Sequence, residues 1–299
     1  MNTLQLRNSF LLLLTAVIWG VAFVAQSVGM DYVGPYTFTC VRSFIGGLFL
    51  IPCIALLNRL NPVSPGGIRP SNAKSKGQLW IGGVCCGVML CFASCFQQIG
   101  IMYTSVGKAG FITSLYIVIV PFFAYFVGQP LRRTAIIGSL LAMIGMYFLA
   151  YPTDGASFNR GDILIAICSV VWSIYILLVD RWAVHYAGFT LVAVEFFFAS
   201  IYNLVLSQLA GEVITLNHIE AALWPILYCG FLGGGLAYSF QFIGQRGVGP
   251  TEASLLLSSE TVFSVIGGWL ILGEILSGRE LVGCLFMLMG IISSQIKIK

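Results

Sequence analysis

The sequence predicts an all-α polytopic membrane protein, with ten transmembrane helices arranged as two inverted five-helix repeats. Three observations support this prediction. First, 58% of the 299 residues are hydrophobic and only 9% are charged, whereas an ordinary soluble domain has roughly 25% charged residues. Second, the apolar residues form blocks of about twenty, which is the helix length that crosses a hydrocarbon core. Third, the second half of the chain repeats motifs of the first half.

Ten apolar blocks, separated by short polar breaks, define the expected helices. Arg7 precedes the first block as in a secretory signal, but the block continues through Trp19-Gly20 without a clear cleavage site, so we expect it to be retained as a helix. In chain order, the blocks cover residues 9–28, 35–58, 78–99, 105–127, 134–151, 162–182, 189–210, 220–240, 249–272 and 279–297.

The basic residues predict the orientation of these helices, because Lys and Arg accumulate on the cytoplasmic side of a membrane protein. In the ten-helix arrangement, eleven of the fifteen lie on the side that carries both termini, three lie on the opposite side, and Arg42 lies inside a span. Both termini are therefore expected to be cytoplasmic. The net charge of +4 follows from this topology and does not indicate a nucleic-acid partner.

An internal repeat organises the chain. The segment FASCFQQIG (92–100) matches LAYSFQFIG (236–244) at five of nine positions, with an offset of 144 residues. Further matches are Ser114/Ser258 at the same offset, Gly138/Gly283 and Gly145/Gly290 at 145, and Trp19/Trp172 at 153. The repeats are expected to cover 1–151 and 162–299. Because five is odd, the second copy enters the membrane from the opposite side, an arrangement that recurs in secondary transporters.

Three segments carry a resemblance to a known family. Trp19-Gly20, AGFITSLYIVIVP (109–121) and ASLLLSSETVFSVIGGWLILGE (253–274) resemble the EamA-type branch of the drug/metabolite transporter superfamily, over essentially the whole chain. The resemblance implies export or exchange of small metabolites, often amino acids or related compounds, across a bacterial inner membrane. Many relatives have Glu-Pro where this chain has Glu260-Thr261, so the proline that would kink the helix is missing. Gln129 stands where a Glu often follows the Gly.

Four polar-edged residues are expected at the centre of the bilayer. Trp19, Tyr116, Trp172 and Glu260 each lie ten or eleven residues into their helices, which is the middle of a span at a rise of about 1.5 Å per residue. A charge there costs roughly 2.5–3.5 kcal/mol, so it usually faces a cavity or a partner. Glu260 is therefore the candidate either to carry a coupling proton or to engage a substrate amine.

Two other charges inside the spans leave alternatives open. Glu260 could instead pair with Arg42, so that the two charges only fix the packing of their helices. Glu195 lies six residues from the end of its helix, where its side chain could reach the membrane surface.

The remaining candidates combine hydrogen-bonding and aromatic side chains. Gln97 and Gln241 could line vestibules or form hydrogen bonds between helices, and the aromatic residues could form a pocket wall or pack as anchors. The expected substrate-binding residues are Trp19, Arg42, Gln97, Tyr116, Trp172, Tyr175, Tyr238, Gln241 and Glu260. Gly138, Ala142, Gly145, Gly283 and Gly290 allow close helix approach, within the chain or in a homodimer.

Several motifs of other protein classes are absent from the sequence. It has no Walker A segment, no GxGxxG between a strand and a helix, and no HExxH, and its two histidines fall in loops on opposite sides of the membrane. We therefore expect neither an enzyme nor a cofactor or metal site. The expected partners are a small-molecule metabolite and the lipid bilayer. The alternative function is a membrane-embedded sensor or scaffold that binds a small molecule without transporting it.

Overall fold

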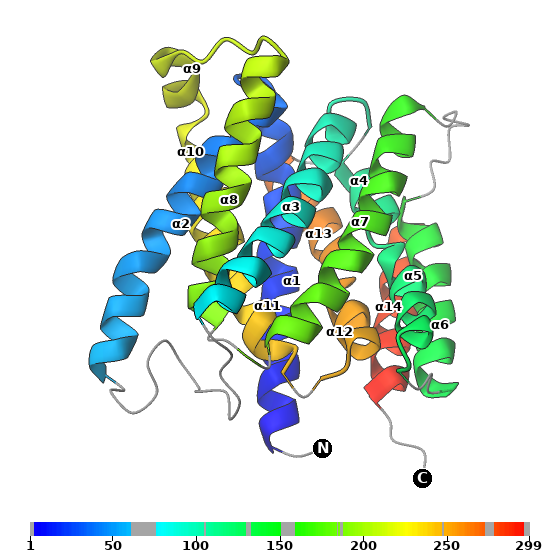
Figure 1. Cartoon of the computed structure of the whole chain (residues 1–299). Coiled ribbons are helices and arrows are strands. Elements are labelled where there is room, and N and C mark those ends of the chain that lie inside the picture. Colours follow the sequence, from blue (N-terminus) through cyan, green and yellow to red (C-terminus); the bar gives the residue numbers. More distant parts are fainter. Residues whose placement is uncertain are drawn as a thin grey trace.

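A computed structural model describes residues 3–60, 76–104, 106–129, 133–150, 159–183, 185, 188–246, 248–272 and 278–295. Within these ranges the chain contains helices, turns and connecting residues but no strand, which confirms the all-α prediction. The helices stand side by side as a bundle (Figure 1). In chain order they are α1 (Thr3–Gly29), α2 (Pro35–Leu60), α3 (Lys76–Ile101), α4 (Val106–Thr113), α5 (Tyr116–Phe126), α6 (Arg133–Ala150), α7 (Arg160–Ala183), α8 (Gly188–Leu209), α9 (Leu216–Ala221), α10 (Leu223–Leu227), the π-helix η1 (Tyr228–Ala237), α11 (Tyr238–Gly244), α12 (Pro250–Leu257), α13 (Glu260–Leu272) and α14 (Gly278–Gln295).

Eight helical segments in the described part of the chain are long and apolar enough to cross a membrane. They are Thr3–Gly29, Pro35–Arg59, Gly77–Ile101, Val106–Phe126, Arg160–Ala183, Gly188–Leu209, Leu223–Gly244 and Pro250–Ile271. Shorter apolar stretches lie within α6, at Arg133–Gly145, and within α14, at Leu281–Ser293. The outer surface exposes large apolar side chains such as Phe126 and Leu270, whereas Asn203 is completely buried. This is the distribution that a lipid environment favours.

Two of the spanning segments are interrupted at their centres. Between α4 and α5, Leu115 N–H donates to Ile112 O (3.2 Å) and Ile117 N–H to Ser114 O (3.0 Å), so the backbone tightens into a 3₁₀ turn. Between α12 and α13, Thr261 N–H donates to Ser258 O in the same way (3.1 Å).

Serine hydroxyls explain why the second interruption forms without a proline. Ser258 Oγ donates to Leu255 O (2.8 Å) and Ser259 Oγ donates to Leu256 O (2.6 Å). Such side-chain bonds compete with the backbone ladder of a helix and bend it. The helix is therefore interrupted immediately before Glu260, although no proline follows that residue.

The segment between α10 and α11 forms a ten-residue π-helix. This conformation is rare and is usually limited to a single turn, often at a functional site. Its glycines permit close packing: a Cβ on Gly234 would lie 2.8 Å from the Phe196 ring, and one on Gly235 would lie 2.6 Å from the Phe49 ring. The π-helix therefore fits closely against α2 and α8.

Glycines also bring α6 and α14 into close contact, which confirms their predicted packing role within the chain. A Cβ on Gly145 would lie 2.6 Å from Gly283 O, and a Cβ on Gly290 would lie 2.6 Å from Gly138 O. The two contacts are equivalent, because the residues of each pair exchange places between the two helices.

Replacing Gly290 with Ala should destabilise this contact, because the added Cβ would overlap backbone atoms of α6. We expect the free energy of unfolding to fall by about 1–3 kcal/mol, the usual cost of overpacking. Thermal unfolding of the detergent-purified protein measures the effect. Gly107→Ala is the matched control, since the nearest atom to its new Cβ is 4.0 Å away; equal effects of the two substitutions would contradict the packing role.

Candidate functional site

A cavity lies between the helices of the bundle. It is lined by Trp19, Ala22, Phe23, Gln26, Arg42, Gln97, Thr113, Tyr116, Trp172, Ile176, Gly233, Tyr238, Gln241, Leu257 and Glu260. All the residues expected from the sequence to bind substrate are present in this set, except Tyr175. The structure thus brings together side chains from both halves of the chain.

Three aromatic rings form one wall of the cavity. Trp19 of α1 lies 4.8 Å from Tyr238 of α11 and 6.3 Å from Trp172 of α7, measured between ring centroids. The Trp19 indole N–H also donates to Gly233 O in the π-helix (3.0 Å), which fixes the orientation of the ring. The wall therefore presents an apolar face to the cavity, and α1, α7 and the η1–α11 segment hold it in place.

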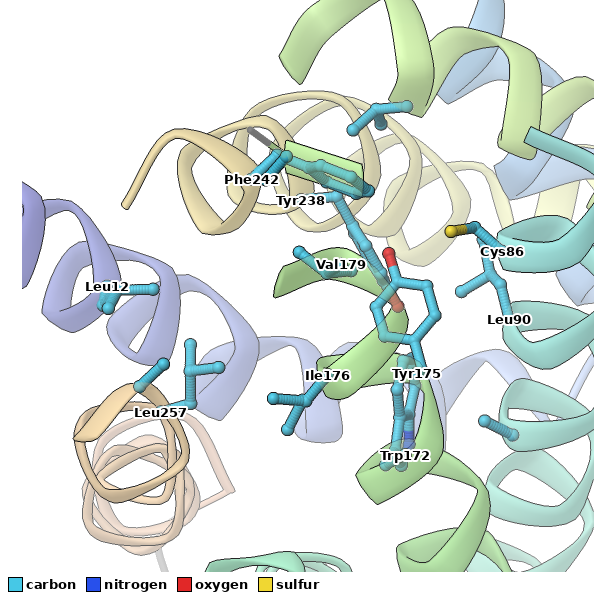
Figure 2. Packing of buried hydrophobic residues seen from close by; sticks show 14 of the residues in the cluster. Leu12, Cys86, Leu90, Trp172, Tyr175, Ile176, Val179, Tyr238, Phe242 and Leu257 are labelled. Atoms are coloured by element: carbon cyan, nitrogen blue, oxygen red, sulfur yellow. The ribbon is translucent and has the colours of Figure 1, made fainter. Parts of the chain in front are cut away.

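Tyr175 lies behind this wall rather than in it. Its side chain is completely buried, with its ring centroid 5.2 Å from that of Trp172 and 6.0 Å from that of Tyr238. Figure 2 shows Tyr175 beside Trp172, with Cys86 and Leu90 of α3 nearby. Tyr175 supports the aromatic wall in this conformation and does not reach the cavity.

Glu260 is the first residue of α13 and lies at the interruption described above. Only 3% of its surface is exposed. Its Oε1 accepts a hydrogen bond from the Tyr116 hydroxyl (3.0 Å) and a longer one from Ser114 Oγ (3.4 Å), while Thr261 Oγ1 lies 2.8 Å from Ser114 Oγ. These hydroxyls partly replace the water that burial removes, and the positive end of the α13 dipole favours a carboxylate at this position.

Arg42 lines the same cavity from α2, with 8% of its surface exposed. It does not form an ion pair with Glu260, and its buried Nε has no hydrogen-bond partner in the described part of the chain. Its guanidinium carbon lies 6.0 Å from the centroid of the Phe38 ring. By contrast, Lys108 and Asp162 do form a close ion pair (2.6 Å). A structural Arg42–Glu260 pair therefore does not explain these two charges.

Three glutamines add hydrogen-bonding capacity to the cavity. Gln97 Nε2 donates to Thr113 Oγ1 at a long 3.4 Å, and Gln26 Nε2 donates to Ala22 O (3.2 Å). The amide nitrogen and oxygen of Gln241 both lack a protein partner among the described residues. Because a buried amide without partners is costly, Gln241 is suited to bind a polar group in the cavity.

Some lining residues were not expected from the sequence. Phe23 and Gln26 lie four and seven residues after Trp19 and therefore share its helix face, so a helical projection from Trp19 would have included them. Gly233 lines the cavity through a π-helix that the sequence pattern does not indicate. The expectation that Glu195 could reach the membrane surface is wrong: its side chain is completely buried, where Tyr175 donates to its Oε1 (3.0 Å).

The fold and the cavity together define a multi-pass helical membrane protein with a central cavity. A sequence model of the EamA-like transporter family matches residues 7–151 and again residues 159–294. The chain belongs to the EamA-like transporter family, and this membership indicates a transporter.

Individual relatives agree with this assignment. The chain is 27% identical over 291 residues to an uncharacterized transporter of Archaeoglobus fulgidus, covering 96% of this chain and 85% of the relative. It is 20% identical to the uncharacterized transporter YoaV of Bacillus subtilis, covering 92% of each chain. A crystal structure of a chain with 20% sequence identity superposes with a TM-score of 0.74 and covers 96% of both chains. It supports the fold alone.

Replacing Tyr116 with Phe should leave Glu260 with only the long hydrogen bond from Ser114. We expect the free energy of unfolding to fall by about 1–3 kcal/mol, because this is the usual cost of a buried hydrogen bond that is not made. A double-mutant cycle with Glu260→Gln measures the coupling between the two side chains. Tyr125→Phe is the control, since Tyr125 is 60% exposed. Additive effects of the Tyr116 and Glu260 substitutions would show that this bond does not stabilise the protein.

Proposed function

We propose that the protein is a secondary transporter that moves small zwitterionic metabolites, with amino acids as the leading class, by alternating access. The observation that carries this proposal is the cavity, where one cationic and one anionic side chain, Arg42 and Glu260, lie beside an aromatic wall without neutralising each other. A zwitterion can satisfy both charges at once, because its carboxylate suits a guanidinium and its ammonium group suits a carboxylate. Trp19, Trp172 and Tyr238 would contact its apolar part, and Gln97 and Gln241 would bind its polar groups.

The proposed mechanism requires two inverted halves, and equivalent residues that touch one another support such a pair. In a structure with a twofold axis, the residues nearest the axis contact their own counterparts. Trp19 and Trp172 are in ring contact at 6.3 Å, and Phe44 and Phe197 at 6.2 Å, both with an offset of 153. Tyr116 and Glu260, with an offset of 144, share a hydrogen bond. We therefore propose a pseudo-twofold relation between residues 1–151 and 162–299. In this proposal α6 and α14 also cross the membrane, so that each half contributes five spans.

The proposed location is the inner membrane of a bacterium, with both termini cytoplasmic. The start of α1 and the end of α14 lie at the same end of the bundle (Figure 1), as an even number of crossings requires. The excess of Lys and Arg on that side supports its assignment to the cytoplasm.

Glu260 is proposed to couple transport to a cation, either the ammonium group of the cargo or a proton. A carboxylate that hydroxyl groups hold in a cavity can release one cation and take up another as the cavity changes the face to which it opens. Net export follows if the cargo gradient or the proton gradient favours that direction, because a carrier of this kind is driven only by the gradients supplied to it.

Counterflow into proteoliposomes tests the transport function directly. Vesicles preloaded with unlabelled amino acids should take up labelled amino acid faster than empty vesicles do. Glu260→Gln should reduce this exchange by about tenfold or more, which corresponds to the loss of a charge-assisted hydrogen bond, and should flatten its dependence on pH. Glu252→Gln, on the same spanning segment but outside the cavity lining, should exchange like the wild type.

Folded wild-type protein that binds amino acids but exchanges none would favour a sensor or scaffold instead. If Glu260→Gln exchanged at the wild-type rate with an unchanged pH profile, the role of Glu260 in coupling would be lost while the carrier function stood.

Replacing Arg42 with Gln tests the proposed carboxylate site. The variant should weaken binding of amino acids by about tenfold but should not weaken binding of amines that lack a carboxylate. Competition by each compound against the exchange of labelled amino acid measures this selectivity. Arg181→Gln, outside the cavity lining, is the control. An equal loss for both compound classes would contradict a carboxylate-binding role.

A further inference from the structure

Glu195 is a buried carboxylate that does not line the cavity. It lies on α8 with no exposed surface. Its Oε1 accepts a hydrogen bond from Tyr175, whereas its Oε2 has no partner in the described part of the chain. An unpartnered carboxylate oxygen in a protein interior is costly, which indicates that this side chain is satisfied in some other state of the protein.

The repeat relates Glu195 to Arg42. The two residues are 153 apart, the same offset that relates Trp19 to Trp172 and Phe44 to Phe197. They also occupy the same place in their helices, because α2 begins at Pro35, α8 begins at Gly188, and each charged residue follows seven positions later. At 1.5 Å per residue, each lies about 10 Å from the start of its helix, and the two helices start at opposite ends of the bundle (Figure 1).

The present conformation treats such equivalent residues differently. Ala22, Gln26 and Arg42 of the first half line the cavity. Their counterparts in the second half are Tyr175, Val179 and Glu195, and all three are completely buried and outside the lining. At these three positions the cavity therefore reaches the first-half residue but not its second-half counterpart, whereas the pairs Trp19/Trp172 and Phe23/Ile176 line it from both halves.

Only a thin layer separates Glu195 from the cavity. Tyr175 donates to the carboxylate, and its ring packs on Trp172 and Tyr238, which line the cavity themselves. The titratable groups that face Glu195 are Tyr175 of α7, Cys86 of α3 and Tyr238 of α11. A rearrangement that moved the Tyr175 and Tyr238 rings would join Glu195 to the cavity.

We propose that Glu195 is a second cation-binding residue of the transport path, which lines the cavity when it opens toward the end of the bundle that carries the termini. In that state Glu195 takes the position that Arg42 holds here, while Arg42, Gln26 and Ala22 become buried. The cation it binds is the ammonium group of the cargo or a proton. The inference rests on the proposed function, because it requires two states of opposite access.

Thiol accessibility tests the location of Glu195 without knowledge of the cargo. In a cysteine-free background, Glu195→Cys should react with the impermeant cationic reagent MTSET from the face that carries the termini, and Arg42→Cys from the opposite face. Asn203→Cys is the control on α8, because Asn203 is completely buried; it should react from neither face. If the Glu195→Cys variant were as unreactive from both faces as the Asn203→Cys variant, the inference would be overturned.

Side-specific exchange tests the binding role. Glu195→Gln should raise the half-saturating amino acid concentration by about tenfold on the face that carries the termini, as expected for the loss of a charge-assisted hydrogen bond, and by less than about twofold on the other face. Glu195→Asp should restore part of the affinity. A purely structural role would instead lower exchange equally on both faces, and that result would overturn the inference.

Exchange of a second compound, the N-acetyl derivative of the amino acid, distinguishes binding of an ammonium group from binding of a proton. If Glu195 binds ammonium, the Glu195→Gln variant should lose affinity for an amino acid but not for its N-acetyl derivative. If it binds a proton, both compounds should be affected, with a flattened pH profile. Absence of exchange by the wild type would instead refute the proposed function and leave the accessibility result to decide the location of Glu195.

Discussion

The hydrogen bond from Tyr116 to Glu260 joins the two interrupted helices at the centre of the molecule. A carboxylate buried in a membrane protein has no lipid partner, so the protein itself must supply its donors. Here the donors come from the opposite interruption, which requires α4–α5 and α12–α13 to meet at their tightened turns. Gly110 permits this approach, because a Cβ at its position would lie 2.9 Å from Ser264 Oγ. The position of Glu260 therefore constrains how four helices pack.

The cavity follows from the same constraint. With Glu260 satisfied by hydroxyl groups, it does not need Arg42 as a counter-ion, and both charges remain available in one cavity. The aromatic wall limits that space on the side of α7 and α11, and the π-helix positions the carbonyl group that holds Trp19 in place. The site thus combines charge, shape and apolar surface, although no single helix contributes all three.

The sequence was sufficient to predict those parts of the structure that depend on periodicity and repetition. Block lengths predicted the eight spanning segments of the described chain, and the 144-residue offset related Tyr116 to Glu260, which the structure joins by a hydrogen bond. Features that depend on tertiary contacts were not predictable in this way. Glu195 was expected to reach the surface because its distance from the helix end permits it, but α3 and α7 enclose it. The π-helix likewise depends on glycines that fit against Phe49 and Phe196, and not on a periodic signal.

The differences between the halves matter for the proposed cycle as much as the similarities. A ligand shifts a conformational equilibrium only if it interacts differently with the two states. If equivalent positions carried identical side chains, the cavities open to either face would bind the cargo equally and the cargo could not favour one state. Arg42 and Glu195 occupy equivalent positions with opposite charge. In the proposed cycle, the cavity that opens to one face presents Arg42 together with Glu260, and this pair of opposite charges favours binding of a zwitterion. The cavity that opens to the other face presents the two carboxylates Glu195 and Glu260, and this pair favours binding of a cation in addition to the cargo.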